Sequence, residues 1–265
     1  MNLHGTKAIF FDLDGTLIKR DDGPFDDDKA AMMQAAEKGH LLFLNTGRSF
    51  GNLPQYVLDL PFLKGIAAGG GSHISLAAPP GENPRFSTVY HNRIPEEVLE
   101  KIFAWYTRQP HPCTLEGERE CYVINKISRH HTARPLIPVD SLEDFKRKSG
   151  GDFITKLTLE RIASQEELSL FEPFFNVNIV VNYTEANLKG DSKATAVEFL
   201  LEKFGIAREN SIAIGDSGND LDMFRACALG IAMGNAPADI KAEAGAVTGD
   251  CGKGGVAQAL EKFVL

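Results

Sequence analysis

The sequence predicts an α/β protein in which a mixed α+β module is inserted into a core built on a parallel sheet. Three observations predict this fold. Strand and helix patterns alternate over the first 70 residues, the same alternation returns near the carboxyl end, and the region between them breaks the pattern. Such alternation is typical of a parallel sheet that carries helices on its faces. The chain of 265 residues has room for two modules, because domains commonly hold about 100–200 residues.

Each element of the core is predicted by a local pattern. Short continuous apolar runs predict buried strands at residues 7–11, 40–47, 64–68, 210–216 and 229–235. Alanine-rich or amphipathic stretches predict helices at residues 27–39, 48–60, 192–205, 219–228 and 254–265. Pro54 is tolerated in the first turns of its helix, Ser192 is a plausible cap, and Gly39 and Gly205 are placed to end helices. Together these elements predict a Rossmann-like, doubly wound parallel sheet.

The middle of the chain predicts the inserted module. Its expected elements are helices at residues 93–109 and 164–175 and strands at residues 118–128, 152–160 and 176–185. A stretch dense in proline and glycine precedes it, and a turn-forming stretch follows it. We therefore expect a core of residues 1–83 and 186–265 and an inserted α+β domain of residues 84–185.

Composition and charge exclude several classes of protein. The formal net charge is −8 and no basic block occurs, so nothing predicts binding to nucleic acid or to an anionic membrane. No apolar stretch approaches the roughly 20 residues of a membrane span, and the amino terminus is too polar for a signal peptide. The four cysteines form no CxxC pair. We expect a cytoplasmic protein that is a monomer or a weak homo-oligomer.

Polar residues follow several of the predicted strands. The candidate site residues are Asp12, Asp14, Thr46, Gly47, Lys193, Asp216, Asn219 and Asp220. Asp12 and Asp14 lie two positions apart, so both side chains can face one site if the strand continues that far. Taken singly, each group also fits a structural role: a turn at the two aspartates, a strand-to-helix turn at Thr46 and Gly47, and a solvated helix residue at Lys193.

Taken together, these residues predict an oxygen-rich pocket at the carboxyl edge of the sheet, where ligands bind in open α/β sheets. Asp12 and Asp216 are hard anionic ligands of the kind that suits Mg²⁺. The cation, Lys193, Thr46 and backbone N–H groups would then neutralise a phosphoryl group, which is what phosphoryl transfer requires.

Four segments resemble motifs one to four of the haloacid dehalogenase (HAD) superfamily: FFDLDGTL, FLNTGRS, Lys193 within LKGDSKATA, and AIGDSGNDLDMF. The segment GIAMGNAPADIKAEAGAVT also resembles the tail of its Cof-type subfamily. The resemblance covers residues 5–75 and 185–265, whereas the module between them is matched only by its length and position. The interval from Thr46 to Lys193 is the one long enough for a large cap, which resembles the C2 class and its Cof-like C2B form.

The resemblance implies a role for each residue. Asp12 is similar to the nucleophile that forms an aspartyl-phosphate, and Asp14 to the acid/base whose backbone carbonyl also binds Mg²⁺. Asp216 would be a Mg²⁺ ligand and Asp220 a supporting residue. The residues implied to bind phosphate are Thr46, Gly47, Lys193 and Asn219.

The second aspartate indicates the substrate class, because dehalogenases of the superfamily lack an acid/base there and transport ATPases carry threonine. The implied function is a Mg²⁺-dependent phosphatase that acts on small phosphorylated metabolites, with sugar phosphates favoured. Two alternatives stay open, a phosphomutase of the phosphomannomutase type and a non-catalytic phosphometabolite-binding protein.

The chain departs from the family pattern in two places. GGGS at residues 69–72 stands where many Cof-type members have Asn-Gly, and Ala194 rather than Gly follows Lys193. Within the cap, the candidates for selecting the leaving group are Arg129, His130 and His131, for which a polar surface turn is the favoured alternative.

Overall fold

The computed structural model describes residues 5–19, 22–79, 82, 84–125, 132–180 and 182–265. By their contacts, these residues fall into two units. Unit 1 comprises the chain up to Gly47 together with Leu60–Val89 and Ser192–Leu265, and unit 2 comprises Arg48–Asp59 and Tyr90–Asp191. Unit 2 thus includes Arg48–Asp59, a segment that the sequence analysis placed in the core. The expected boundaries at residues 84 and 185 stay a prediction.

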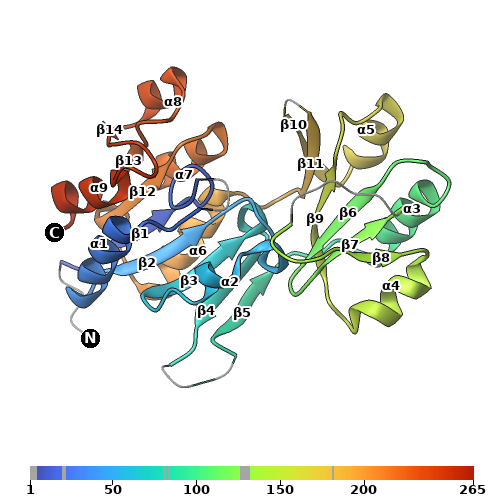
Figure 1. The fold of residues 1–265 in the computed structure, drawn as a ribbon, viewed down its shortest axis with the longest axis horizontal. Coiled ribbons are helices and arrows are strands. Elements are labelled where there is room, and N and C mark those ends of the chain that lie inside the picture. The colour runs from blue at the N-terminus through green and yellow to red at the C-terminus, as the bar shows by residue number, and fades with distance from the viewer. Residues whose placement is uncertain (1–4, 20–21, 80–81, 83, 126–131, 181) are drawn as a thin grey trace. The chain divides into compact units, whose positions relative to one another are not determined.

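Unit 1 is built on an eight-stranded sheet with the order β14-β13-β12-β1-β2-β3-β4-β5 (Figure 1). Its strands are β1 Ala8–Phe11, β2 Leu41–Asn45, β3 Leu63–Ala68, β4 His73–Ala77, β5 Phe86–His91, β12 Ser211–Gly215, β13 Leu229–Ala232 and β14 Ala246–Val247. The last two residues of β5, Tyr90 and His91, are counted with unit 2. The pairs from β14 to β3 are parallel, and β4 joins β3 antiparallel. β1, β2 and β12 are buried along their whole length, because their apolar runs are covered on both faces. The predicted α/β fold with a parallel core is confirmed.

The helices of unit 1 cover this sheet on two faces. They are α1 Asp26–Glu37, α6 Lys193–Phe204, α7 Leu221–Ala226, α8 Ala238–Glu243 and α9 Gly255–Phe263. α1 packs with α9 and α6 packs with α7, and Figure 1 shows α1 and α6 on opposite sides of the sheet. Ser192 caps α6 by accepting hydrogen bonds from the N–H groups of Ala194 and Thr195, and Gly205 ends the helix at φ +62°. Both predicted ends of α6 are therefore confirmed.

Unit 2 is built on a six-stranded sheet with the order β10-β11-β9-β6-β7-β8. Its strands are β6 Cys113–Gly117, β7 Cys121–Ile124, β8 Ile137–Val139, β9 Ile154–Leu159, β10 Phe175–Val180 and β11 Tyr183–Leu188. Its helices are α2 Gln55–Leu58, α3 Glu96–Tyr106, α4 Leu142–Ser149 and α5 Gln165–Phe171. Residues of α3, α4 and α5 join strand residues in one apolar core, in which Tyr106, Tyr122 and Phe171 are fully buried. Among the described residues, we find no helix long and apolar enough to cross a membrane.

The helix predicted at residues 48–60 is wrong. The segment forms a 3-10 turn, η1 Phe50–Asn52, followed by the four-residue helix α2. Pro54 lacks an N–H group and lies just outside α2 in an extended conformation, which separates the two turns. The side chains of Ser49 and Asn52 donate to the buried Glu116 carboxylate at 3.0 and 3.3 Å, so partners distant in sequence hold the segment.

Two strand predictions in unit 2 also need correction. Residues 176–185 are predicted as one strand but belong to two antiparallel strands, β10 and β11. Residues 118–128 contain only β7, which pairs with the unpredicted strand β6, and residues 126–128 lie outside the described part of the chain. Period-two alternation continues through a hairpin, so it does not by itself mark the turn.

Candidate active site

Asp12 lies at the carboxyl edge of the sheet in unit 1. Its N–H group donates to the carbonyl of Ile214 at 2.9 Å and so continues the ladder between β1 and β12. Its side chain is buried, and Oδ1 accepts a hydrogen bond from Nζ of Lys193 at 2.6 Å. Because β1, β2 and β12 run parallel in adjacent positions, Thr46 and Asp216 leave the sheet at the same edge.

Lys193 is the first residue of α6, and its ammonium group is buried among acceptors. Nζ donates to Oδ1 of Asp12 and of Asp220, each at 2.6 Å, and to Oδ1 of Asn219 at 3.3 Å. These three acceptors match the three N–H donors of an ammonium group. The backbone carbonyl of Lys193 accepts a hydrogen bond from Nδ2 of Asn45 at 2.9 Å. A positive charge opposes the dipole at a helix N-terminus, and the two carboxylates offset that cost.

Asp220 has both carboxylate oxygens engaged within the protein. Oδ1 accepts from Lys193, while Oδ2 accepts from the N–H groups of Asp216 and Ser217 at 2.9 and 3.0 Å. The side chain is fully buried, and a Cβ at Gly215 would lie 2.4 Å from its Cγ. Glycine at position 215 therefore allows this close approach. Asp220 orients Lys193 and the loop after β12.

Asp216 differs from Asp220 because one of its oxygens has no partner within the part of the chain that the structure describes. Oδ2 accepts from Nδ2 of Asn235 at 3.2 Å, whereas Oδ1 is buried and has no hydrogen-bond partner among the described residues. Gly15, at φ +83°, packs directly against the Asp216 carboxylate, since a Cβ at Gly15 would lie 2.2 Å from Oδ2 of Asp216. Carboxylate oxygens of Asp12, Asp216 and Asp220 lie within 4.8 Å of one another.

The site carries more negative than positive charge. Burial raises the pKa of Asp12 to about 8; Lys193 opposes this shift, and Asp220 adds to it. Burial, followed by the charge of Asp220, raises the pKa of Asp216 to about 6. Burial lowers the pKa of Lys193, but the charges of Asp12 and Asp220 outweigh it and raise the pKa above its usual value. Lys193 is therefore protonated at neutral pH.

This donor set fits a divalent cation. Three clustered carboxylates face one ammonium group, and a buried acceptor, Oδ1 of Asp216, has no partner among the described residues. Buried polar groups are normally paired, so an unpaired carboxylate oxygen beside two more carboxylates calls for a positive ligand. Hard oxygen donors suit a hard cation.

The remaining predicted residues lie around this cluster. Asp14 is exposed, and its charge contributes to the raised pKa of Asp216. Thr46 is buried, and its backbone carbonyl accepts from the N–H of Gly70 at 2.9 Å. A Cβ at Gly47 would lie 3.7 Å from Nδ2 of Asn219, so these two residues are neighbours.

Two contributors were missed by sequence reasoning. Asn45 ends β2 and holds the backbone of Lys193, and Asn235 follows β13 and holds Asp216. Asn235 lies in the GIAMGN segment, which resembles the tail of the Cof-type subfamily. That resemblance was the sequence signal that could have pointed to Asn235. Arg129, His130 and His131 lie outside the described residues.

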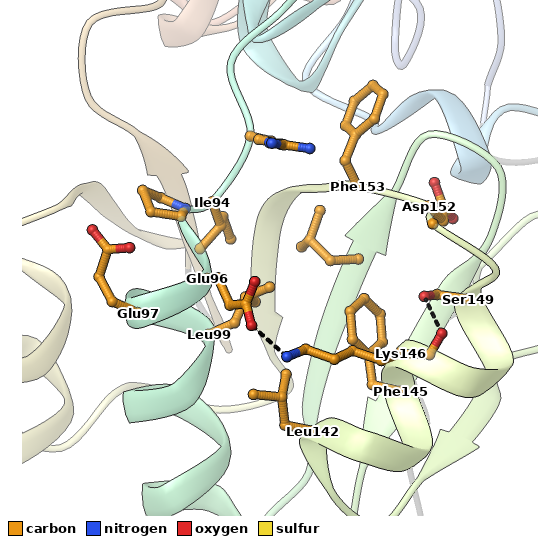
Figure 2. A pocket seen from close by; sticks show the side chains of 14 residues that line it. Ile94, Glu96, Glu97, Leu99, Leu142, Phe145, Lys146, Ser149, Asp152 and Phe153 are labelled. Carbon is orange, nitrogen blue, oxygen red and sulfur yellow. Dashed lines mark hydrogen bonds and ion pairs between the residues drawn. The ribbon is translucent and has the colours of Figure 1, made fainter.

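A separate pocket of about 700 Å³ lies within unit 2, between α3 and α4 (Figure 2). Its lining contains none of the predicted site residues. Its apolar lining includes Ile94, Leu99 and Phe145, and an ion pair between Glu96 and Lys146 crosses it. Both charged side chains are at least half exposed, so this pair is worth little energetically.

Comparison with known proteins agrees with this geometry. The family model described as haloacid dehalogenase-like hydrolase matches residues 9–260, and the chain belongs to that family. The resemblance drawn from the four motifs is thereby confirmed.

Among its relatives, 5-amino-6-(5-phospho-D-ribitylamino)uracil phosphatase YcsE of Bacillus subtilis is 27% identical over 259 residues, which cover 98% of this chain and 96% of YcsE. Putative phosphatase YkrA of the same organism is 26% identical over 268 residues, covering 98% of each chain. The solved structure of the HAD subclass IIB sugar phosphatase BT4131 has a TM-score of 0.77 and 26% identity, covering 97% of this chain and 99% of that one. These names support a phosphoric monoester hydrolase.

Proposed function

We propose that the chain is a Mg²⁺-dependent phosphatase that hydrolyses small phosphorylated metabolites, sugar phosphates above all, through an aspartyl-phosphate on Asp12. The observation that carries the proposal is the buried Asp12 carboxylate, whose Oδ1 lies 2.6 Å from Nζ of Lys193. Beside it lies Oδ1 of Asp216, which has no partner among the described residues. The names of YcsE and of the sugar phosphatase BT4131 add support for the substrate class.

In this proposal the two N-terminal aspartates divide the chemistry. The Asp12 carboxylate attacks phosphorus and the bond to the leaving oxygen breaks, while Asp14 gives that oxygen a proton. Asp14 then takes a proton from the water that hydrolyses the aspartyl-phosphate and releases phosphate. Burial raises the pKa of Asp12, but Lys193, together with a divalent cation when bound, would favour the ionised form that attacks; Asp14 is exposed, where it can exchange a proton with the leaving oxygen and with water.

The other residues hold the reacting group. The residues proposed to contact phosphoryl oxygens are Thr46, Gly47, Lys193 and Asn219. When bound, Mg²⁺ would supply the positive charge that draws electron density from those oxygens. The groups proposed to hold it are the carboxylates of Asp12 and Asp216 and the backbone carbonyl of Asp14, and Asp220 supports Lys193. The cytoplasmic location and the monomeric or weakly associated state stay predictions of the sequence.

The test is phosphate release from a panel of sugar phosphates and other phosphate monoesters, with and without Mg²⁺. Asp12→Asn should lower kcat by more than about 10³-fold, because loss of a covalent nucleophile removes the main route. Asp239→Asn is the matched control, since Asp239 is exposed in α8 and is not part of the carboxylate cluster.

Each outcome decides between functions. Most of the activity surviving in Asp12→Asn would contradict the nucleophile assignment. Isomerisation of hexose phosphates without net phosphate release would identify a phosphomutase instead. Tight phosphate-ester binding without turnover would identify a binding protein.

A further inference from the structure

We propose that Asn235 is the positioning residue that presents the free oxygen of Asp216 to the divalent cation, an inference that rests on the function proposed above. Asn235 follows β13 and contacts three other loops of unit 1. Its Nδ2 donates to the carbonyl of Gly15 at 2.9 Å and to Oδ2 of Asp216 at 3.2 Å. Its Oδ1 accepts from the N–H of Cys251 at 2.7 Å.

These partners determine which way the Asn235 amide points. The N–H of Cys251 can only donate, and the carbonyl of Gly15 can only accept. The reversed amide would place its NH₂ group against the Cys251 N–H and its oxygen against the Gly15 carbonyl, losing all three hydrogen bonds. The donor side of the amide therefore faces Asp216.

The amide fixes the orientation of the Asp216 carboxylate and with it the direction in which the second oxygen points. The last torsion of an aspartate has a broad distribution, so the plane of the carboxylate is loosely held unless a contact fixes it. Asn235 engages Oδ2, which leaves the buried Oδ1 without a partner among the described residues. Oδ1 of Asp216 is thus held in an orientation in which it can bind the cation.

The same amide also restrains the loop after β1. Its bond to the Gly15 carbonyl holds the residue that directly follows Asp14, whose own carbonyl is one of the proposed ligands. Gly15 packs so closely against Oδ2 of Asp216 that a Cβ there would lie at 2.2 Å. Asn235 therefore restrains two proposed ligands at once, the Asp216 carboxylate and, through Gly15, the backbone carbonyl of Asp14.

The alternative is that Asn235 serves only to tie down the loop that contains Cys251. Thr248→Val separates the two roles. The hydroxyl of Thr248 donates to the carbonyl of Gly255 at 2.6 Å, which ties the same loop without any bond to Asp216. Asn235 is exposed, so Asn235→Ala does not open a buried cavity.

The experiment is titration calorimetry of the full chain with Mg²⁺ alone, in the absence of substrate, on wild type, Asn235→Ala and Thr248→Val. Residues that orient a metal ligand typically contribute about 10–100-fold to metal affinity. We expect the Kd for Mg²⁺ to rise by about that factor in Asn235→Ala and to stay within about twofold in Thr248→Val. Saturating Mg²⁺ should restore most of kcat in Asn235→Ala, because the residue acts through the cation.

Two results would overturn the inference alone: wild-type Mg²⁺ affinity in folded Asn235→Ala, or equal weakening in Thr248→Val. Wild-type protein that binds no Mg²⁺ would overturn the proposed cofactor and this inference with it. If Asn235→Ala does not fold, Asn235→Ser takes its place in the same titration, with the same expected loss, because serine cannot present the two amide donors.

Discussion

Gly71 lies where the chain leaves no room for a side chain. It closes the 3-10 turn η2, Gly69–Gly71, at φ +100°. A Cβ at Gly71 would lie 2.2 Å from the carbonyl oxygen of Ser192, the cap residue that directly precedes Lys193. The obstructing atom belongs to the backbone, so no side-chain rotation can relieve the overlap. We predict that Gly71→Ala displaces the start of α6 and the lysine that follows it.

Gly70 provides a matched control one residue away. It has φ +65° and ψ +33°, the ordinary left-handed region, and a Cβ there meets nothing within 4 Å. Gly70→Ala should therefore lower the free energy of unfolding by only about 1–2 kcal/mol, the usual cost of that conformation. Gly71→Ala carries a similar conformational cost and adds about 1–3 kcal/mol of overpacking. Its total loss should be about 2–5 kcal/mol.

The assay is urea unfolding at 25 °C for wild type and both variants, with kcat/KM for phosphate release measured beside it. We expect Gly71→Ala to lose more stability than Gly70→Ala and to lose activity, because the Lys193 ammonium must stay between its two carboxylates. Equal losses of stability in the two variants, or wild-type activity in Gly71→Ala, would refute the reasoning.

Two further predictions concern buried charges. Lys193→Met leaves the Asp12 and Asp220 carboxylates buried without their ammonium partner, so the free energy of unfolding without metal should fall by about 3–5 kcal/mol at pH 9, above the Asp12 pKa of about 8, and by less at pH 6, where Asp12 is protonated in the wild type as well. Urea unfolding at both pH values checks this, and a loss below about 1 kcal/mol at pH 9 contradicts it. Asp28 is fully buried and accepts from the N–H of Ala257 at 2.8 Å, and burial raises its pKa above 3.8. Its ionised form therefore disfavours the folded state, and stability is lost as pH rises from about 4 through the raised pKa. Asp28→Asn keeps an acceptor without the charge, so its stability relative to wild type should increase between pH 4 and pH 7; a pH-independent difference in urea unfolding would count against this assignment.

Much of the candidate site was predictable because its residues directly follow strands with strong local signals. Asp12, Thr46 and Asp216 follow β1, β2 and β12, whose apolar runs mark them as buried strands and whose parallel pairing aligns their carboxyl ends. Lys193 was different, since a cation in the first turn of a helix is locally unfavourable. That unfavourable position made it a weak candidate, and the family resemblance implied its phosphate-binding role. The structure supplies a reason for a cation there, since two carboxylate oxygens lie 2.6 Å from Nζ.

Other features could not be predicted because their partners are distant in sequence. The segment after Gly47 has a helix-like pattern, yet Ser49 and Asn52 bond to Glu116 and hold it as short turns in unit 2. Asn45 holds the backbone of Lys193 across more than half the chain. No local pattern records such a pairing, because it depends on how the chain folds back.

The sequence by itself determined the α/β class, and it predicted the edge of the sheet that carries the candidate site with its carboxylates, lysine and hydroxyl. The tertiary structure alone decided how the aspartates differ. Asp216 and Asp220 share one short loop, but Lys193 and two backbone N–H groups donate to both oxygens of Asp220. Asn235 donates to one oxygen of Asp216, and the other has no partner in the described part of the chain. The physical reason is that a carboxylate's role depends on which donors reach it, and those donors arrive from α6 and from the loop after β13.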